Sequence, residues 1–177
     1  YNFATVCVFP CFVARAAELL SQSSPANTPE TNDYANRVNE PLSDTNQDES
    51  STNTSNTTDI NTKVNTTKVC SVVGFPFGMN ETRTKVFEAA CAIESGAEEL
   101  DMVINLGAGN DGDMTYLARD VEAVLERCRE SGDVVLKVIL ESSAFPNDTK
   151  ISMCRLMSNL GVDYIKTSTG LHPSGGA

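Results

Sequence analysis

The chain of 177 residues has no tryptophan, a single histidine and few basic side chains. Its 13 Lys and Arg residues are outnumbered by 24 Asp and Glu residues, which gives a formal net charge of -11. Because nucleic-acid phosphates require a surface of Lys and Arg, this balance predicts no nucleic-acid partner. No apolar run is long enough to cross a bilayer, so we also predict no membrane partner.

Metal-binding and dinucleotide-binding patterns are missing as well. The six cysteines are scattered without a C-x-x-C pair, and one histidine leaves no recognisable zinc set. No G-x-G-x-x-G follows the first apolar run, and we interpret Gly107-Ala108-Gly109 as a turn. Most cysteines lie in apolar strand or helix patterns, which indicates reduced core thiols in a cytoplasmic protein. They are Cys7, Cys11, Cys70, Cys91, Cys128 and Cys154.

Residues 21–68 have a composition unlike that of the rest of the chain. This stretch is rich in Asn, Thr, Ser, Asp and Glu and has almost no apolar residues. It cannot bury enough surface to offset chain entropy, so we predict a disordered insertion. Residues 1–20 are then the first βα unit of the fold, and residues 69–177 carry the remaining units.

Apolar runs and amphipathic segments alternate along the rest of the chain. Strands are expected at Thr5–Phe9, Val69–Gly74, Leu100–Leu106, Val134–Leu140 and Asp163–Lys166, and helices at Phe12–Leu20, Glu81–Ser95, Met114–Ser131 and Asn147–Leu160. This alternation predicts an α/β fold with a parallel sheet and right-handed crossovers. The strands are nearly continuous apolar runs, as expected when both faces of the sheet are covered.

Three charged residues interrupt these apolar strands. Asp101 and Lys137 lie inside strands and Lys166 ends one. Two-residue alternation sends Asp101, Val103 and Asn105 to one face of their strand, and Lys137, Ile139 and Glu141 to one face of theirs. Such a Lys can be an edge residue or half of an inert ion pair, since buried charges are rare unless paired. In a barrel, the inward face near the carboxyl ends of the strands is where active sites form.

Lys166 has a context of its own, because the hydroxyl-rich Thr-Ser-Thr-Gly follows it. Such a loop can bind an oxyanion through backbone N–H groups and hydroxyls. An amine that is desolvated beside another cation gives up its proton more readily, and the neutral amine attacks carbonyl carbons. The combination suggests Schiff-base chemistry.

The chain resembles the 2-deoxyribose-5-phosphate aldolases, which are class I aldolases built on a TIM (β/α)₈ barrel. The matching segments are VCVFPCFV (Val6–Val13), VCSVVGFPFG (Val69–Gly78), EAACAIESGAEELDMVINLG (Glu88–Gly107), LKVILESS (Leu136–Ser143) and DYIKTSTG (Asp163–Gly170). They occur in the family's order and cover the chain outside residues 21–68. The resemblance implies an incomplete barrel of about five βα units.

The resemblance also implies roles for five residues. Lys166 matches the Lys that forms the Schiff base, Asp101 matches the Asp that exchanges protons, and Lys137 matches a Lys that tunes charge. Thr169 and Gly170 lie where the family's site for the substrate phosphate begins. No metal or cofactor is implied, the partner is a small sugar phosphate, and a homodimer remains open.

The implied reaction is reversible cleavage of 2-deoxy-D-ribose 5-phosphate to acetaldehyde and D-glyceraldehyde 3-phosphate, in deoxyribonucleotide catabolism. The family's first, seventh and eighth strands have no counterpart here, so we expect the isolated chain to be inactive or barely active. Two alternatives stay open: a non-catalytic remnant that binds sugar phosphates, and another Schiff-base barrel aldolase such as a transaldolase-like enzyme.

Overall fold

The computed structural model describes residues 3–22, 67–132, 134–173 and 175. The strands are β1 (Thr5–Val8), β2 (Lys68–Val73), β3 (Glu99–Val103), β4 (Val135–Ile139) and β5 (Tyr164–Lys166). The α-helices are α1 (Val13–Gln22), α2 (Thr82–Glu94), α3 (Leu106–Asp111), α4 (Met114–Glu130) and α5 (Asn147–Leu160), with 3₁₀ turns η1 (Pro10–Phe12) and η2 (Ser142–Ala144). No α-helix within these ranges has the length and apolar character needed to cross a membrane.

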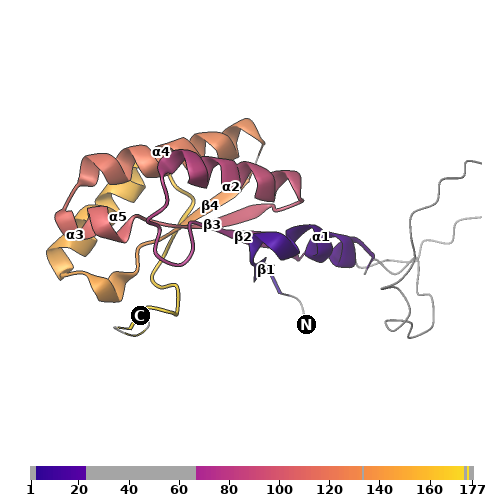
Figure 1. Ribbon diagram of the computed structural model, residues 1–177, viewed down its shortest axis with the longest axis horizontal. Coiled ribbons are helices and arrows are strands. Elements are labelled where there is room, and N and C mark those ends of the chain that lie inside the picture. The colour runs from indigo at the N-terminus through magenta and orange to yellow at the C-terminus, as the bar shows by residue number, and fades with distance from the viewer. Residues whose placement is uncertain (1–2, 23–66, 133, 174, 176–177) are drawn as a thin grey trace, which may run out of the picture.

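The five strands form one parallel sheet in the order β1-β2-β3-β4-β5, which is also their order in the chain. Parallel neighbours joined by right-handed crossovers without a reversal of direction place all connecting helices on the same face of the sheet. Helices α2 and α4 lie side by side over that face (Figure 1). The α/β class and the parallel sheet predicted from the sequence are therefore confirmed.

The main apolar core lies between the sheet and these helices. Alternate residues of each central strand enter it, such as Leu100 and Met102 of β3 and Leu136 and Val138 of β4. Helix residues meet them from above, among them Ala89, Ala92, Leu117, Val121, Val124, Met153 and Met157. The intervening strand residues must point to the opposite face, so that face is free to carry polar chemistry.

One predicted turn is a helix. Gly107-Ala108-Gly109 lies within α3, and β3 ends at Val103 rather than continuing to Leu106. The side chain of Asn105 caps the helix, because its Oδ1 accepts a hydrogen bond of 3.1 Å from the Ala108 N–H. A Cβ at Gly109 would lie 2.8 Å from Phe145 Cζ, so the glycine that resembled a turn residue permits close packing instead.

The insertion predicted for residues 21–68 lies outside the described residues except at its two ends. There its boundaries shift slightly, since α1 continues to Gln22 and β2 already begins at Lys68.

The cysteine prediction is partly wrong. All six thiols are free, as expected, but only Cys70 and Cys128 are buried. Cys91 and Cys154 occupy exposed positions of α2 and α5, and Cys7 and Cys11 are exposed near the edge strand β1. An apolar sequence pattern did not distinguish a helix position that faces the core from its exposed neighbour.

Candidate active site

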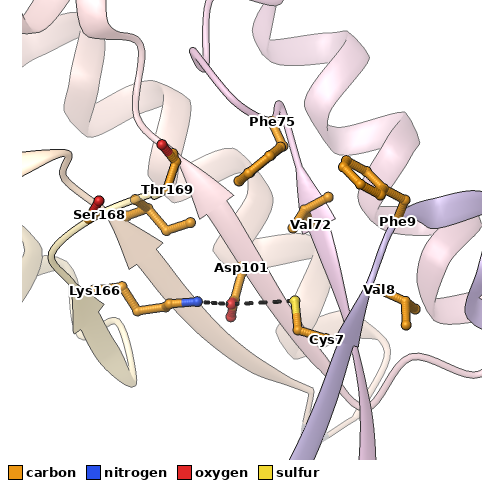
Figure 2. Close-up of a pocket in the computed structure, with 10 residues that line it drawn as sticks. Cys7, Val8, Phe9, Val72, Phe75, Asp101, Lys166, Ser168 and Thr169 are labelled. Atoms are coloured by element: carbon orange, nitrogen blue, oxygen red, sulfur yellow. Dashed lines mark hydrogen bonds and ion pairs between the residues drawn. The ribbon is translucent and has the colours of Figure 1, made fainter. Parts of the chain in front are cut away.

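A cavity of about 250 Å³ opens at the carboxyl end of the sheet (Figure 2). Its walls come from all five strands and from the segments that follow them. The lining residues are Cys7, Val8, Phe9, Val72, Phe75, Asp101, Ile139, Lys166, Ser168 and Thr169. The cavity therefore lies on the face of the sheet opposite the main core and contains two of the charged residues singled out in the sequence.

Asp101 is the centre of the charged cluster. One carboxylate oxygen, Oδ1, accepts a hydrogen bond of 3.0 Å from Lys137 Nζ, and the other, Oδ2, accepts one from Lys166 Nζ. The strand register explains this arrangement, because Asp101 pairs with Lys137 across β3 and β4 and Lys166 is one strand further on. The side chain of Asp101 is only 2% exposed, whereas that of Lys166 is 39% exposed and can reach solvent.

The opposite charges of this cluster stabilise the ionised form of Asp101 and the protonated form of Lys137. Burial favours the neutral acid, but the hydrogen bonds and charges of Lys166 and Lys137 outweigh it and hold the pKa of Asp101 below its ordinary value. Burial acts to lower the pKa of Lys137, but hydrogen bonds to Glu99 and Asp101 prevail and raise it. Lys137 Nζ is 2.5 Å from Glu99 Oε2, so Lys137 is a fixed cation held by two carboxylates.

Cys7 and Cys70 lie next to this cluster. They are direct partners in the register of β1 and β2. Cys7 Sγ donates a hydrogen bond of 3.7 Å to Asp101 Oδ2, and Lys137 Nζ donates one of 3.6 Å to Cys70 Sγ. The interaction between the two thiols lowers the pKa of Cys7 and, together with burial, raises that of Cys70.

These two thiols were not predicted as site residues. They are separated in the chain by η1, α1 and residues 23–66, so no local spacing such as C-x-x-C marks them. The two Sγ atoms and a carboxylate oxygen of Asp101 all lie within 4.8 Å of one another. Within the described part of the chain, this is the group of His, Cys, Asp or Glu side chains whose geometry could hold a metal ion.

The loop after β5 holds the two residues expected at the phosphate site. Thr169 lines the cavity, while Gly170 is exposed with φ 79° and is not among the lining residues. The N–H of Thr169 donates a hydrogen bond of 3.0 Å to Glu141 Oε2, and its hydroxyl donates to the same oxygen. The Gly170 N–H donates a hydrogen bond of 2.9 Å to Ser168 Oγ. These donors are thus already engaged within the protein.

Glu141 is a further residue whose role the sequence did not predict. It follows β4 in the left-handed region (φ 51°, ψ 59°), which is uncommon for a residue other than glycine. Its side chain is fully buried, and Oε1 has no hydrogen-bond partner. The sequence signal was a charge that closes an apolar strand, but periodicity assigned Glu141 only to the face of Lys137 and did not reveal its contact with Thr169.

Comparison with known proteins shows that the sequence of this chain is similar to those of one protein family. The family model described as DeoC/LacD family aldolase matches residues 51–175. A deoxyribose-phosphate aldolase of Thermoanaerobacter sp. (strain X514) is 35% identical over 175 residues, which are 99% of this chain and 60% of that protein. The chain therefore spans about 60% of the length of this curated relative.

Solved structures agree with the sequence matches. The crystal structure of a candidate deoxyribose-phosphate aldolase from Coccidioides immitis superposes with a TM-score of 0.69 at 32% identity, covering 97% of this chain and 50% of that chain. A tetrameric deoxyribose phosphate aldolase from Aeropyrum pernix gives 0.55 at 34% identity, covering 59% of this chain and 43% of that one. Together with the strand order, these matches confirm the TIM-barrel type of fold, of which the described residues form five strands.

Proposed function

The chain belongs to the DeoC/LacD family of aldolases, and on this premise we propose that it cleaves 2-deoxy-D-ribose 5-phosphate reversibly to acetaldehyde and D-glyceraldehyde 3-phosphate. The observation that carries the proposal is the contact of the buried Asp101 carboxylate, which lines the cavity, with two lysines. A lysine that reaches a cavity beside a charged carboxylate is suited to imine chemistry, because the acid can move the protons that each step releases or consumes.

In the proposed reaction Lys166 is the nucleophile. Its neutral amine attacks the aldehyde carbon C1 of the open-chain sugar, and loss of water from the carbinolamine gives an iminium ion. The iminium accepts the electron pair of the bond between C2 and C3 when that bond breaks, which leaves an enamine on Lys166 and releases D-glyceraldehyde 3-phosphate. Protonation of the enamine carbon and hydrolysis then release acetaldehyde and restore the amine.

Asp101 exchanges the protons in this scheme. The C3 hydroxyl must lose a proton as the bond breaks, and the enamine carbon must gain one. The carboxylate that already contacts Lys166 Nζ is close to both positions, directly or through one water molecule. Its depressed pKa keeps it ionised, and therefore able to accept a proton, before the reaction begins.

Lys137 keeps the charge of the cluster fixed. It is held by Glu99 as well as Asp101, and its raised pKa keeps it positive throughout. We propose that this permanent cation holds Asp101 in the ionised form that the proton transfers require. Lys137 is not among the residues that line the cavity, so it acts on substrate through Asp101.

The loop of Thr169 and Gly170 is the proposed site of the substrate phosphate. Support comes from the position of Thr169 on the cavity wall, directly beyond Lys166. Because Glu141 Oε2 already accepts from both Thr169 donors, a phosphate must bind in place of that carboxylate or beside it. The homodimer, the cytoplasmic location and the separate status of residues 21–68 remain predictions.

Borohydride trapping tests the nucleophile directly. The purified chain is incubated with acetaldehyde and sodium borohydride, and modified peptides are identified by mass spectrometry. We expect an ethyl group on Lys166, and loss of that label in Lys166→Ala. Lys150→Ala is the matched control, because Lys150 lies on α5 away from the cavity and should leave labelling unchanged.

Turnover distinguishes the aldolase from a sugar-phosphate binder. Cleavage of 2-deoxy-D-ribose 5-phosphate is followed by coupling D-glyceraldehyde 3-phosphate to a dehydrogenase. Labelling of Lys166 with any measurable cleavage supports the proposal, whereas a rate near that of an intact aldolase would contradict the expectation that the isolated chain is barely active. Binding of the sugar phosphate with no labelling in a folded chain supports the non-catalytic alternative, and labelling that persists in Lys166→Ala refutes the assignment of the nucleophile.

A further inference from the structure

The cavity carries a second set of reactive groups that the proposed aldol reaction does not use. Cys7 and Cys70 face each other from neighbouring strands, and both sulfur atoms lie within 4.8 Å of a carboxylate oxygen of Asp101. Figure 2 shows the Cys7 sulfur directed toward Asp101 from the side opposite Lys166. Two thiols and one carboxylate that converge on the same point form a donor set typical of zinc rather than of magnesium or calcium.

We propose that Cys7, Cys70 and Asp101 form a binding site for a thiophilic divalent cation such as Zn²⁺. The fourth position of a tetrahedral site would be taken by water from the cavity, since Cys7 lines its wall. Zn–S bonds of about 2.3 Å place two sulfur ligands roughly 3.8 Å apart in such a site. The two sulfur atoms lie within 4.8 Å of each other, which exceeds that value by no more than about 1 Å.

The two lysines beside the site do not prevent binding of a cation. Lys137 Nζ keeps Glu99 Oε2 as a partner at 2.5 Å when Asp101 turns toward the metal. Lys166 has a side chain that is 39% exposed, so its ammonium group can turn to solvent. Binding releases the two thiol protons as the sulfur atoms become thiolates, which leaves two thiolates and one carboxylate to neutralise the cation.

Occupation of this site has a consequence for the reaction. Asp101 can bind the cation or serve Lys166, but one carboxylate cannot do both with the same oxygen. The metal should therefore act as a competitive inhibitor of the imine step, with the same carboxylate as the shared group. This consequence rests on the proposed aldolase function, whereas binding of the cation does not.

Cadmium provides a direct probe, because each cadmium–thiolate bond adds ultraviolet charge-transfer absorption. The reference protein is the full chain with Cys91→Ser and Cys154→Ser, which removes two exposed thiols outside the cluster. The reduced protein is titrated with Cd²⁺ alone and then with Zn²⁺ as competitor. We expect one tight equivalent with absorption from two thiolates, displaced by Zn²⁺.

Single substitutions in that background locate the ligands. Loss of even an outer partner of a ligand typically weakens metal binding by about 10- to 100-fold, so Cys7→Ser and Cys70→Ser should each weaken it at least that much. Each should also remove about half of the thiolate absorption. Cys11→Ser is the matched control, since Cys11 is exposed on the adjacent turn η1 and lies outside the cluster.

Three results of these titrations would overturn the proposed metal site. Unchanged Cd²⁺ affinity in folded Cys7→Ser, or absorption from a single thiolate, overturns the proposal. Far-UV circular dichroism establishes that the buried Cys70→Ser variant is folded, and Cys7→Ser gives an answer from an exposed position where folding is not at risk. Equal loss of affinity in Cys11→Ser also overturns it, because binding would then not depend on the cluster.

Borohydride trapping with and without Zn²⁺ tests the competition. We expect Zn²⁺ to reduce labelling of Lys166 in the reference protein, and to have a much smaller effect on Cys7→Ser relative to that variant's own metal-free labelling. If Lys166 is never labelled, the proposed aldolase function fails while the cadmium titration still decides the metal site. If labelling proceeds and Cd²⁺ does not bind, the metal site fails and the function stands.

Discussion

Glu141 Oε2 accepts hydrogen bonds from both the backbone N–H and the hydroxyl of Thr169, and so joins the end of β4 to the loop that follows Lys166. Two backbone hydrogen bonds run beside this contact, from Leu140 N–H to the Lys166 carbonyl at 3.0 Å and from Ser142 N–H to the Thr167 carbonyl at 2.7 Å. The position of Lys166 therefore depends on a buried carboxylate whose residue has a left-handed backbone conformation.

Replacement of Glu141 by glutamine tests this role. Glu141→Gln keeps the shape of the side chain but places a buried amide NH₂ group either on the Thr169 donors or at the position of the unpartnered Oε1. We expect the free energy of unfolding to fall by about 1–3 kcal/mol, the usual cost of an unsatisfied buried polar group. Hydrogen exchange of residues 167–171 should become faster. Glu122→Gln, at an exposed position of α4, should change stability by less than about 0.5 kcal/mol.

A buried ion pair fastens α2 to α4 and to the end of β3. Lys85 Nζ is 2.6 Å from Asp120 Oδ2 and donates to the Val103 carbonyl at 3.1 Å, while Thr82 Oγ1 donates to Asp120 Oδ1 at 2.8 Å. Both charged side chains are fully buried. We expect Lys85→Met or Asp120→Leu alone to lower the free energy of unfolding by about 3–5 kcal/mol, because the remaining charge is buried and unpaired.

The double variant distinguishes a buried pair from ordinary packing. Lys85→Met with Asp120→Leu leaves no buried charge, so urea unfolding should show recovery of much of the lost stability. Arg83→Ala is the matched control on the same helix, because Arg83 and its partner Glu81 are largely exposed and such pairs contribute about 0–1 kcal/mol. Additive losses in the double variant would contradict this interpretation.

The order of elements could be predicted from the sequence because each apolar run and each amphipathic segment reports its own periodicity. The charged residues Asp101, Lys137 and Lys166 could be predicted for the same reason, since a charge inside an apolar strand needs a partner. Local patterns could not show where α3 begins. Asn105 continues the alternation of β3 in the sequence, but its side chain caps a helix in the structure.

Residues whose contacts lie far apart in the chain escaped sequence reasoning. Cys7 meets Cys70, and Glu141 meets Thr169, only because parallel strands bring their ends together. The sequence analysis did not single out Lys85, whose side chain is buried and whose ammonium group contacts Asp120. In each case the spacing within one element gave no sign of the partner, which is fixed by the register and by helix packing.

The contacts of Asp163 lead us to expect that the stability of the protein depends on pH. Its Oδ1 is 2.9 Å from Arg129 Nη2, and its Oδ2 accepts a hydrogen bond of 2.8 Å from the Leu136 N–H at the start of β4. Burial acts to raise the pKa of Asp163, but Arg129 and the Leu136 N–H outweigh it and hold the pKa below its ordinary value.

A carboxylate with a depressed pKa contributes stability above its unfolded pKa and loses that contribution as the pH falls through its folded pKa. Asp163→Asn should therefore lower the free energy of unfolding by about 1–2 kcal/mol at neutral pH, because it loses one charged contact and weakens one hydrogen bond. The difference from the parent should shrink as the pH falls through the acidic range. Urea unfolding from neutral to acidic pH measures it, and a difference that is constant with pH would exclude the carboxylate as its cause.

Substitution of Gly78 should reduce the free energy of unfolding strongly, because the loop after β2 packs directly against the backbone at the end of β3. The residue is buried with φ 63°, and a Cβ there would lie 1.8 Å from the Ile104 carbonyl oxygen and 2.6 Å from that of Val103. Gly78→Ala must therefore move the main chain just beyond Asp101, in addition to the cost of a left-handed alanine. We expect a loss of more than about 3 kcal/mol in the free energy of unfolding from conformational strain and overpacking together.

Gly112→Ala separates the two causes, since Gly112 has φ 71° but no atom within 4 Å of the position that a Cβ would take. That control should lose only the conformational cost of about 1–2 kcal/mol. Equal losses in the two variants, measured by urea unfolding, would mean that the contact with Ile104 adds nothing and that the loop is free to move away from the end of β3.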